Sequence, residues 1–161
     1  MNLIFRMLRV LISSFFKEKL PVEALHSSLT MHVLPNDLDL NMHMNNGRYL
    51  TICDLSRVDI FIRSGLAKTM LKQKWQPVIA EHTMTYKKPL NLFQKYQVSA
   101  EVTHWDEKFF YLTHTFESKG RVVAQGTSKG CVISHKGVIS PTLAIASTTS
   151  RLKITKSNIN R

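Results

Sequence analysis

The sequence predicts an α+β domain in which an antiparallel sheet wraps around one central helix, with an extra amphipathic helix at the N-terminus. Three observations support this prediction. One long segment, residues 46–64, repeats its apolar residues at helical spacing. One strand-like segment precedes it and four long ones follow it, with short turns between them. Strands that follow one another without intervening helices are typical of an α+β fold. A length of 161 residues fits a single domain.

The N-terminal segment, residues 1–16, is strongly apolar but does not have the features of a secretory signal. Arg6 and Arg9 interrupt the apolar run, no small-residue cleavage site follows, and the run is too short to span a bilayer. On a helix its polar residues form one narrow stripe: Asn2, Arg6, Arg9, Ser13 and Lys17. Such a helix either lies in the interface of an anionic membrane, with its arginines at headgroup level, or packs on the domain or on a partner subunit.

The central part of the chain begins with a strand over residues 27–35 and a turn at Pro35-Asn36-Asp37. We expect the central helix from Asn46 to about Ser64, buried on several sides, and we expect Gly65 to end it as a left-handed cap. A short basic helix or turn follows over residues 66–73.

The second half of the chain changes to strand periodicity. The expected strands are residues 78–87, 95–105, 108–118 and 121–134, with a tight hairpin at Lys119-Gly120 and a last turn at residues 135–137. From Ser140 onward many Ser and Thr residues and scattered basic residues show no sustained period, so we expect mostly irregular structure. The expected organisation is an N-terminal amphipathic helix (1–19), the main domain (20–140) and a basic Ser/Thr-rich tail (141–161).

The segment between the first strand and the central helix concentrates the polar chemistry. Asp39, Asn41 and His43 alternate at period two, so in an extended segment they share one side, with Leu40, Met42 and Met44 on the other. Asn45 and Asn46 then supply N-cap chemistry for the helix, whose positive dipole end lies beside that polar face. The simpler alternative is that the aspartates are turn residues, His43 is a loop histidine and the asparagines are only caps.

Residues 39–49 closely resemble the Asp-x-Asn-x-His-x-Asn-Asn-x-x-Tyr signature of plant acyl-carrier-protein thioesterases. They resemble more loosely the signature of bacterial 4-hydroxybenzoyl-CoA thioesterases. Both families have the hotdog fold, whose order of one strand, a helix and four antiparallel strands matches the elements expected here. The similarity extends more weakly through residues 105–111 and covers about residues 28–134.

The resemblance implies an acyl-CoA or acyl-carrier-protein thioesterase with catalysis by Asp39, Asn41 and His43. Asp39 acts either as general base toward water or as the attacking nucleophile, and the residues leave both routes open. His43 polarises the carbonyl or orients the water, and backbone N–H groups near Asn46 and Gly47 are candidate oxyanion donors.

Other side chains are secondary candidates. Tyr49 and Cys53 are expected to contact the substrate, together with Ile52 and Phe61 around an acyl pocket. Asp54 and Asp59 are further carboxylates, more readily explained as partners of Arg57 or Arg63. Glu81 is another, more readily explained with His82 as an exposed pair on a strand. Five basic residues are available to contact coenzyme A phosphates: Arg48, Lys87, Lys88, Arg121 and Lys129.

Composition limits the partners. The formal charge of +11 favours anionic partners, although most of the lysines are explained by a solvated surface. The two cysteines lie far apart in the sequence and indicate neither a disulfide framework nor a metal site. They are compatible with a cytoplasmic protein. If residues 1–16 bind a membrane, the protein is expected to be peripheral to it. We expect no metal, no cofactor besides the coenzyme A of the substrate and no nucleic acid, for which a recognisable reading motif is lacking.

We expect a homodimer or homotetramer, because a single sheet of this kind leaves an edge unpaired. The alternatives to the hydrolase are a non-catalytic binding module for acyl thioesters or membranes and a hotdog hydratase or dehydratase.

Overall fold

The computed structural model of the chain describes residues 2–149, without the side chain of Asn2. The expectations that involve Met1, the side chain of Asn2 and residues 150–161 lie outside this range. The elements are α1 (Asn2–Phe16), β1 (His26–His32), a 3₁₀ turn (Pro35–Asp37), α2 (Asn46–Ser64), α3 (Leu66–Gln73), β2 (Gln76–Tyr86), β3 (Lys95–Trp105), β4 (Phe110–Ser118), β5 (Arg121–Ser134) and β6 (Gly137–Ile139).

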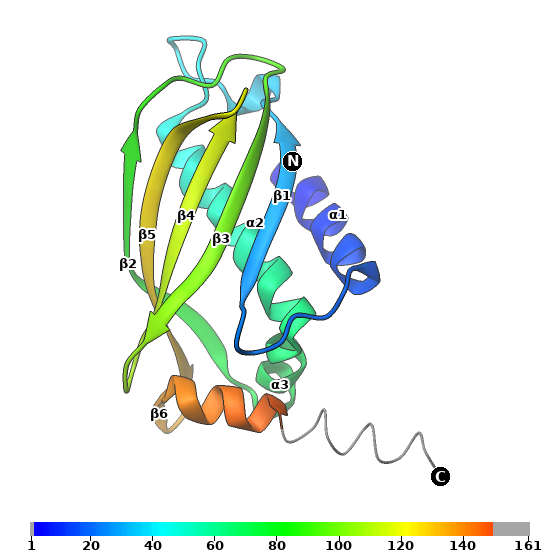
Figure 1. Cartoon of the computed structure of the whole chain (residues 1–161), viewed down its shortest axis with the longest axis vertical. Helices are drawn as coiled ribbons and strands as arrows, with labels where there is room; N and C mark the ends of the chain where they lie inside the picture. The colour runs from blue at the N-terminus through cyan, green and yellow to red at the C-terminus, as the bar shows by residue number, and fades with distance from the viewer. Residues whose placement is uncertain (1, 150–161) are drawn as a thin grey trace.

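The strands form one antiparallel sheet in the order β1-β3-β4-β5-β2, and the short β6 pairs with β5. Figure 1 shows this sheet curving along α2, which is the arrangement predicted from the sequence. The hairpin between β4 and β5 turns at Lys119 and Gly120, whose φ angles of 51° and 70° are those of a two-residue hairpin turn. β2 lies at the edge of the sheet and is exposed along most of its length.

Helix α2 begins and ends where the sequence predicts. The side chain of Asn45 caps it by accepting a hydrogen bond from the Gly47 N–H at 2.8 Å, and Gly65 ends it in the left-handed conformation with φ 83°. Ile52 and Leu55 are fully buried on this helix, and Ile60 is nearly so. Because several sides of the helix are buried, its apolar residues are not confined to one face, and the helix forms the centre of the core.

Helix α1 lies beside α2 and β1 (Figure 1). Two residues of its polar stripe, Arg6 and Arg9, donate hydrogen bonds to carbonyl groups of β1. The Arg6 side chain is buried in an ion pair with Asp37, and Ser14 donates a hydrogen bond to Asp59. The expectation that both arginines face lipid headgroups is therefore wrong for Arg6, because a buried carboxylate holds its guanidinium against the domain. Packing on the domain is confirmed for the face of α1 that carries Arg6 and Ser14. No helix among residues 2–149 is long and apolar enough to cross a membrane.

The start of the C-terminal tail differs from the expectation of irregular structure. A helix spans residues 141–149, with the Ser140 hydroxyl accepting a hydrogen bond from the Leu143 N–H at 3.2 Å. Ala144 is fully buried, and the Thr148 hydroxyl donates to that of Thr69 on α3 at 3.1 Å. A capping Ser followed by Pro141 is a helix start signal, which the Ser/Thr-rich composition of the tail obscured.

Candidate active site

The segment of Asp39, Asn41 and His43 is a tight turn, and the extended conformation expected for it is wrong. The Asp39 N–H donates to the His43 carbonyl at 2.9 Å, and the Met42 N–H donates back to the Asp39 carbonyl at 3.1 Å. Met42 adopts a left-handed φ of 60° at the turn. The reason lies in the aspartate itself, because its short carboxylate bonds to backbone N–H groups just ahead and stabilises a turn over a strand.

The carboxylate of Asp39 is half-buried and held from one side. Its Oδ1 accepts hydrogen bonds from the N–H groups of Asn41 at 2.9 Å and His43 at 3.4 Å. Its Oδ2 has no hydrogen-bond partner among the described residues 2–149. The turn therefore orients the carboxylate with one oxygen and leaves the other available to a reactant.

The other members of the motif are spread around this turn. Asn41 is exposed and lines the same open depression as Asp39, together with Asn45. His43 is half-buried, and its backbone forms a bridge with Asn91. At the tip of the turn Leu40 and Met42 are exposed, while only Met44 of the three apolar residues enters the core. The turn thus keeps Asp39 and Asn41 together and presents an apolar tip.

Some backbone N–H donors at the start of α2, next to the turn, are already hydrogen-bonded. The Gly47 N–H, an expected oxyanion donor, already bonds to the Asn45 side chain. The carbonyl of Asn46 accepts a hydrogen bond from the Tyr86 hydroxyl on β2 at 3.1 Å, which ties the edge strand to the start of α2. Gly47 can serve an oxyanion only if the Asn45 cap gives way.

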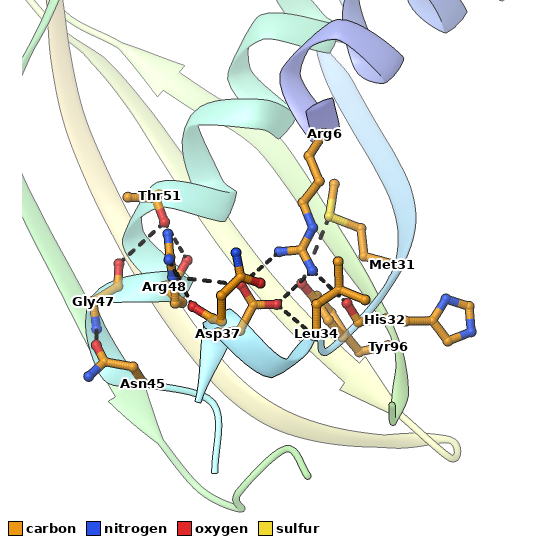
Figure 2. A network of polar contacts seen from close by, with 11 residues as sticks. Arg6, Met31, His32, Leu34, Asp37, Asn45, Gly47, Arg48, Thr51 and Tyr96 are labelled. Atoms are coloured by element: carbon orange, nitrogen blue, oxygen red, sulfur yellow. Dashed lines mark hydrogen bonds and ion pairs between the residues drawn. The ribbon is translucent and has the colours of Figure 1, made fainter. Parts of the chain in front are cut away.

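A buried ion pair that sequence patterns did not reveal fixes the base of the turn (Figure 2). Asp37, 1% exposed, accepts hydrogen bonds from both terminal nitrogens of Arg6 at 3.1 and 2.6 Å and from the Leu34 N–H at 2.9 Å. Its carbonyl accepts from the Asn45 N–H at 2.8 Å, and Arg48 on α2 lies 3.6 Å from its carboxylate. Asp37 therefore joins α1, the turn and the N-cap of α2, and Arg48 is engaged here rather than free for a phosphate.

Tyr49 and Cys53, expected to contact the substrate, are buried in the core. The Tyr49 ring packs edge-on against Tyr86 and Phe116, and burial raises the pKa of its hydroxyl to about 12. Burial likewise raises the pKa of the Cys53 thiol to about 12. Neither residue lines the apolar pocket between α2 and the sheet, whereas Phe61 does.

Asp54 and Asp59 are partners of basic residues, as expected. Asp54 pairs with Arg57, and Asp59 pairs with Arg63 at 3.2 Å. Burial raises the pKa of Asp59, but hydrogen bonds from Ser14, Ser27 and Lys17 outweigh that effect and leave the pKa below its usual value. Glu81 is exposed on β2 opposite Lys129 of β5, whose ammonium lies 4.4 Å from the centre of the Phe109 ring.

A second group of polar side chains lies inside the domain and had no local signal in the sequence. Arg57 bonds to Ser128 at 3.0 Å, and the imidazole of His114 lies 2.8 Å from the same hydroxyl. His114 is fully buried; burial, Arg57 and His82 lower its pKa to about 3, so its ring is neutral. These residues come from α2, β2, β4 and β5, and only the fold brings them together.

A narrow apolar pocket lies between α2 and the sheet. Its wall combines Ile60 and Phe61 of α2 with residues of β2, β3, β4 and β5, and Arg57 is the charged side chain among them. The lining strand residues include Val78, Ile79, Val102, Phe110, Leu112 and Val132. At about 30 Å³ the pocket has room for little more than one water molecule, so its walls must move apart to admit a hydrocarbon or aromatic acyl group.

Known proteins resemble this chain in sequence and in fold. Protein THEM6 of Xenopus laevis is 39% identical over 84 residues, which are 52% of this chain and 41% of that protein. A probable thioesterase of Saccharomyces cerevisiae, YBR096W, is 32% identical over 96 residues, or 58% of this chain and 41% of that protein. The chain spans about half the length of the curated relatives it matches.

The solved structure of the gentisyl-coenzyme A thioesterase BH1999 superposes with a TM-score of 0.67 at 21% identity, covering 74% of this chain and 98% of that one. The likeness in structure confirms the hotdog fold. The family model of the thioesterase-like superfamily matches residues 33–146, which include the Asp39 turn, α2 and all the strands from β2 to β6. The chain therefore belongs to the thioesterase-like superfamily.

Proposed function

We propose that this chain hydrolyses acyl thioesters and that Asp39 is its catalytic carboxylate. The observation that carries the proposal is the one-sided fixation of Asp39, with Oδ1 bound by the backbone of its own turn and Oδ2 without a partner among residues 2–149. Membership of the thioesterase-like superfamily supports hydrolysis of a thioester in general terms. The assignment of the reaction to Asp39 rests on the turn and on its position before α2.

Two routes are open to this carboxylate. As a general base, Oδ2 takes a proton from a water molecule, whose oxygen attacks the carbonyl carbon while the C–S bond breaks and the sulfur leaves as a thiol. As a nucleophile, Oδ2 attacks the same carbon, the C–S bond breaks and the sulfur leaves as a thiolate that takes a proton from solvent; water then hydrolyses the resulting anhydride to the carboxylic acid and regenerates the Asp39 carboxylate. In both routes Asn41, in the same depression, orients the reacting groups, and His43 polarises the carbonyl.

The acyl carrier is proposed to be coenzyme A, with acyl carrier protein as the alternative. A gentisyl-coenzyme A thioesterase is among the structures of the same fold. The net charge of +11 favours a carrier that bears phosphates, and Lys87 and Lys88 are exposed just after β2. The apolar pocket beside Phe61 is proposed to widen and take the acyl group.

Release of free thiol from a panel of short, long and aromatic acyl-CoAs tests this function. We expect catalytic release from at least one member, with turnover proportional to enzyme concentration. Binding without release would favour the non-catalytic module. Hydration or dehydration of the acyl chain with the thioester intact would favour the hydratase.

We also propose that the chain works as a homodimer joined through the edge strand β2, with assembly to a tetramer left open. β2 is long and exposed and has no neighbour on its outer side among the described strands. An unpaired strand of that length is a template for pairing with a second copy. The partner subunit's α2 is then the proposed source of oxyanion donors, on release of the Asn45 cap that engages the Gly47 N–H in each copy.

Light scattering at micromolar concentration measures this assembly. We expect a mass of at least twice the 18.5 kDa of one chain, unchanged on moderate dilution because the pairing of two sheets buries many backbone groups. A mass of 18.5 kDa under these conditions would reject the dimer.

Contact with an anionic membrane is proposed for the outer face of α1. This face exposes Ile4, Phe5, Leu8, Ile12, Phe15 and Phe16, of which Phe16 is 87% exposed. Apolar patches of this kind mark interaction surfaces. Lysines stand beside it, since Lys19, Lys68 and Lys72 share a cavity with Phe15 and the exposed Leu71. The outer face of α1 would insert into the bilayer interface, with the lysines at headgroup level. This arrangement fits an interfacial helix of a cytoplasmic, peripheral protein.

Replacing Phe5, Ile12 and Phe16 together by serine is expected to reduce co-flotation with vesicles containing phosphatidylserine by at least tenfold. These side chains point away from the domain, so the unfolding midpoint should change little, whereas deletion of α1 would also remove Arg6 and Ser14 from the interior. The matched control replaces three exposed apolar residues elsewhere: Phe93, Val138 and Leu143. Equal flotation of both triple variants and the parent would exclude α1 as the membrane contact.

A further inference from the structure

Three potential metal ligands converge between the central helix and the sheet. Cys53 of α2, His82 of β2 and His114 of β4 each offer one ligand atom, and these atoms lie within 4.8 Å of one another. The rings of the two histidines are 5.5 Å apart. No sequence spacing indicates such a site, because the three residues belong to separate elements.

Both histidines have a ring nitrogen without a partner. Nδ1 of the fully buried His114 and Nε2 of the half-buried His82 make no hydrogen bond among the described residues 2–149. Buried polar atoms are nearly always satisfied, since leaving one bare is costly. Two such atoms beside a buried thiol indicate that a bound group satisfies them.

The surroundings of His114 suit a metal ligand. Its other nitrogen, Nε2, lies 2.8 Å from the Ser128 hydroxyl, which also accepts a hydrogen bond from Arg57 at 3.0 Å. Nη1 of Arg57 also lies 3.2 Å from Nε2, and because a guanidinium only donates, Nε2 is the acceptor in the metal-free ring and Nδ1 carries the proton. Metal binding at Nδ1 therefore moves this proton to Nε2, which then donates to the Ser128 hydroxyl, and such a second hydrogen bond is what usually fixes a metal-binding imidazole. The positive charge of Arg57 is offset by its ion pair with Asp54.

The donor set selects the metal. One thiolate and two imidazoles are ligands typical of Zn²⁺, which prefers four ligands in a tetrahedron and here would keep one position for water or another small ligand. In such a tetrahedron the ligand atoms stand roughly 3.3–3.8 Å apart. The present separations of up to 4.8 Å require the side chains to close by about 1 Å, and His82, half-buried on the edge strand, is the side chain assigned this movement.

We propose that Cys53, His82 and His114 form a Zn²⁺ site that ties the edge strand β2 to α2 and β4. The ion replaces the thiol proton of Cys53, which leaves to solvent, and occupies the lone pairs of both unpartnered nitrogens. This proposal goes beyond thioester hydrolysis and does not depend on it. It also replaces the expectation of no metal, which rested on sequence spacing alone.

The test uses the untagged full-length chain, stripped with a chelator and then dialysed against Zn²⁺ or Co²⁺. We expect one Zn²⁺ per chain by elemental analysis, a rise in the thermal unfolding midpoint with Zn²⁺, and a thiolate-to-Co²⁺ charge-transfer band in the near ultraviolet. Cys53→Ser should abolish the band, and His82→Gln should weaken Co²⁺ binding at least tenfold.

The matched controls are Cys131→Ser, which removes the other free cysteine, and His104→Gln, which removes a surface histidine. Both should bind metal like the parent. Absence of metal binding to the parent would overturn the site and leave a buried water as the partner of the two nitrogens. Parent-like binding in folded His82→Gln would overturn it equally, even if Cys53→Ser failed to fold.

Discussion

Asp39→Asn is expected to lower kcat/KM for the best acyl-CoA substrate by ~10²–10⁴-fold. The amide keeps the size of the side chain, and its Oδ1 can still accept the hydrogen bonds of the Asn41 and His43 N–H groups that hold the turn. It neither takes a proton from water nor attacks a carbonyl. Thiol release would measure the drop, and His43→Ala should give a smaller one because its proposed role is to polarise the carbonyl, while Asp39 still supplies the base or nucleophile.

The chain offers a close control for this substitution. Asp106 also closes a turn by accepting two backbone N–H groups, from Lys108 and Phe109, both at 2.7 Å. Asp106→Asn should therefore report the cost of altering such a turn without altering the reaction. Asp39→Asn activity within a few-fold of the parent would reject the assignment and move the carboxylate role to Asp54, Asp59 or Glu81.

Arg6→Met is expected to destabilise the fold by about 3–5 kcal/mol. The substitution keeps an unbranched side chain but leaves the carboxylate of Asp37, 1% exposed, without its main partner. Arg48, 3.6 Å away on α2, compensates only in part. Urea unfolding should show a lower midpoint with an unchanged slope, which assigns the effect to stability rather than to a change in the surface exposed.

Arg9→Met is the matched control, one turn farther along α1. Arg9 is exposed and donates one hydrogen bond to the Thr30 carbonyl, so its loss should cost less than about 1 kcal/mol. If Arg6→Met and Arg9→Met had the same small effect, the Arg6–Asp37 pair would not anchor α1 to the base of the turn.

Elements with strong local signals could be predicted from the sequence nearly to the residue. The helix from Asn46 to Ser64 has a capping asparagine before it and Gly65 after it, and both act on neighbouring backbone groups. The hairpin at Lys119-Gly120 is equally local. In these cases the physical cause lies within a few residues, so no knowledge of tertiary contacts is needed.

The features that could not be predicted depend on contacts between distant residues or on competing local signals. Arg6 and Asp37 are 31 positions apart, and nothing near Arg6 indicates that it is buried rather than facing lipid. His82 and His114 meet only because β2, β4 and α2 pack together. At Asp39 the alternation of polar and apolar residues favours a strand, but the hydrogen bonds that its carboxylate accepts from nearby backbone N–H groups stabilise a turn.

The measurement that tests the central claim most directly is the analysis of both products of one acyl-CoA in ¹⁸O-labelled water. Hydrolysis at Asp39 predicts equal amounts of free thiol and carboxylic acid from the parent over many turnovers, with label in the acid, and almost none of either from Asp39→Asn. Failure of the parent to release thiol above the uncatalysed rate from any acyl-CoA or acyl-carrier-protein substrate, or transfer of the acyl group without label from water, would contradict it.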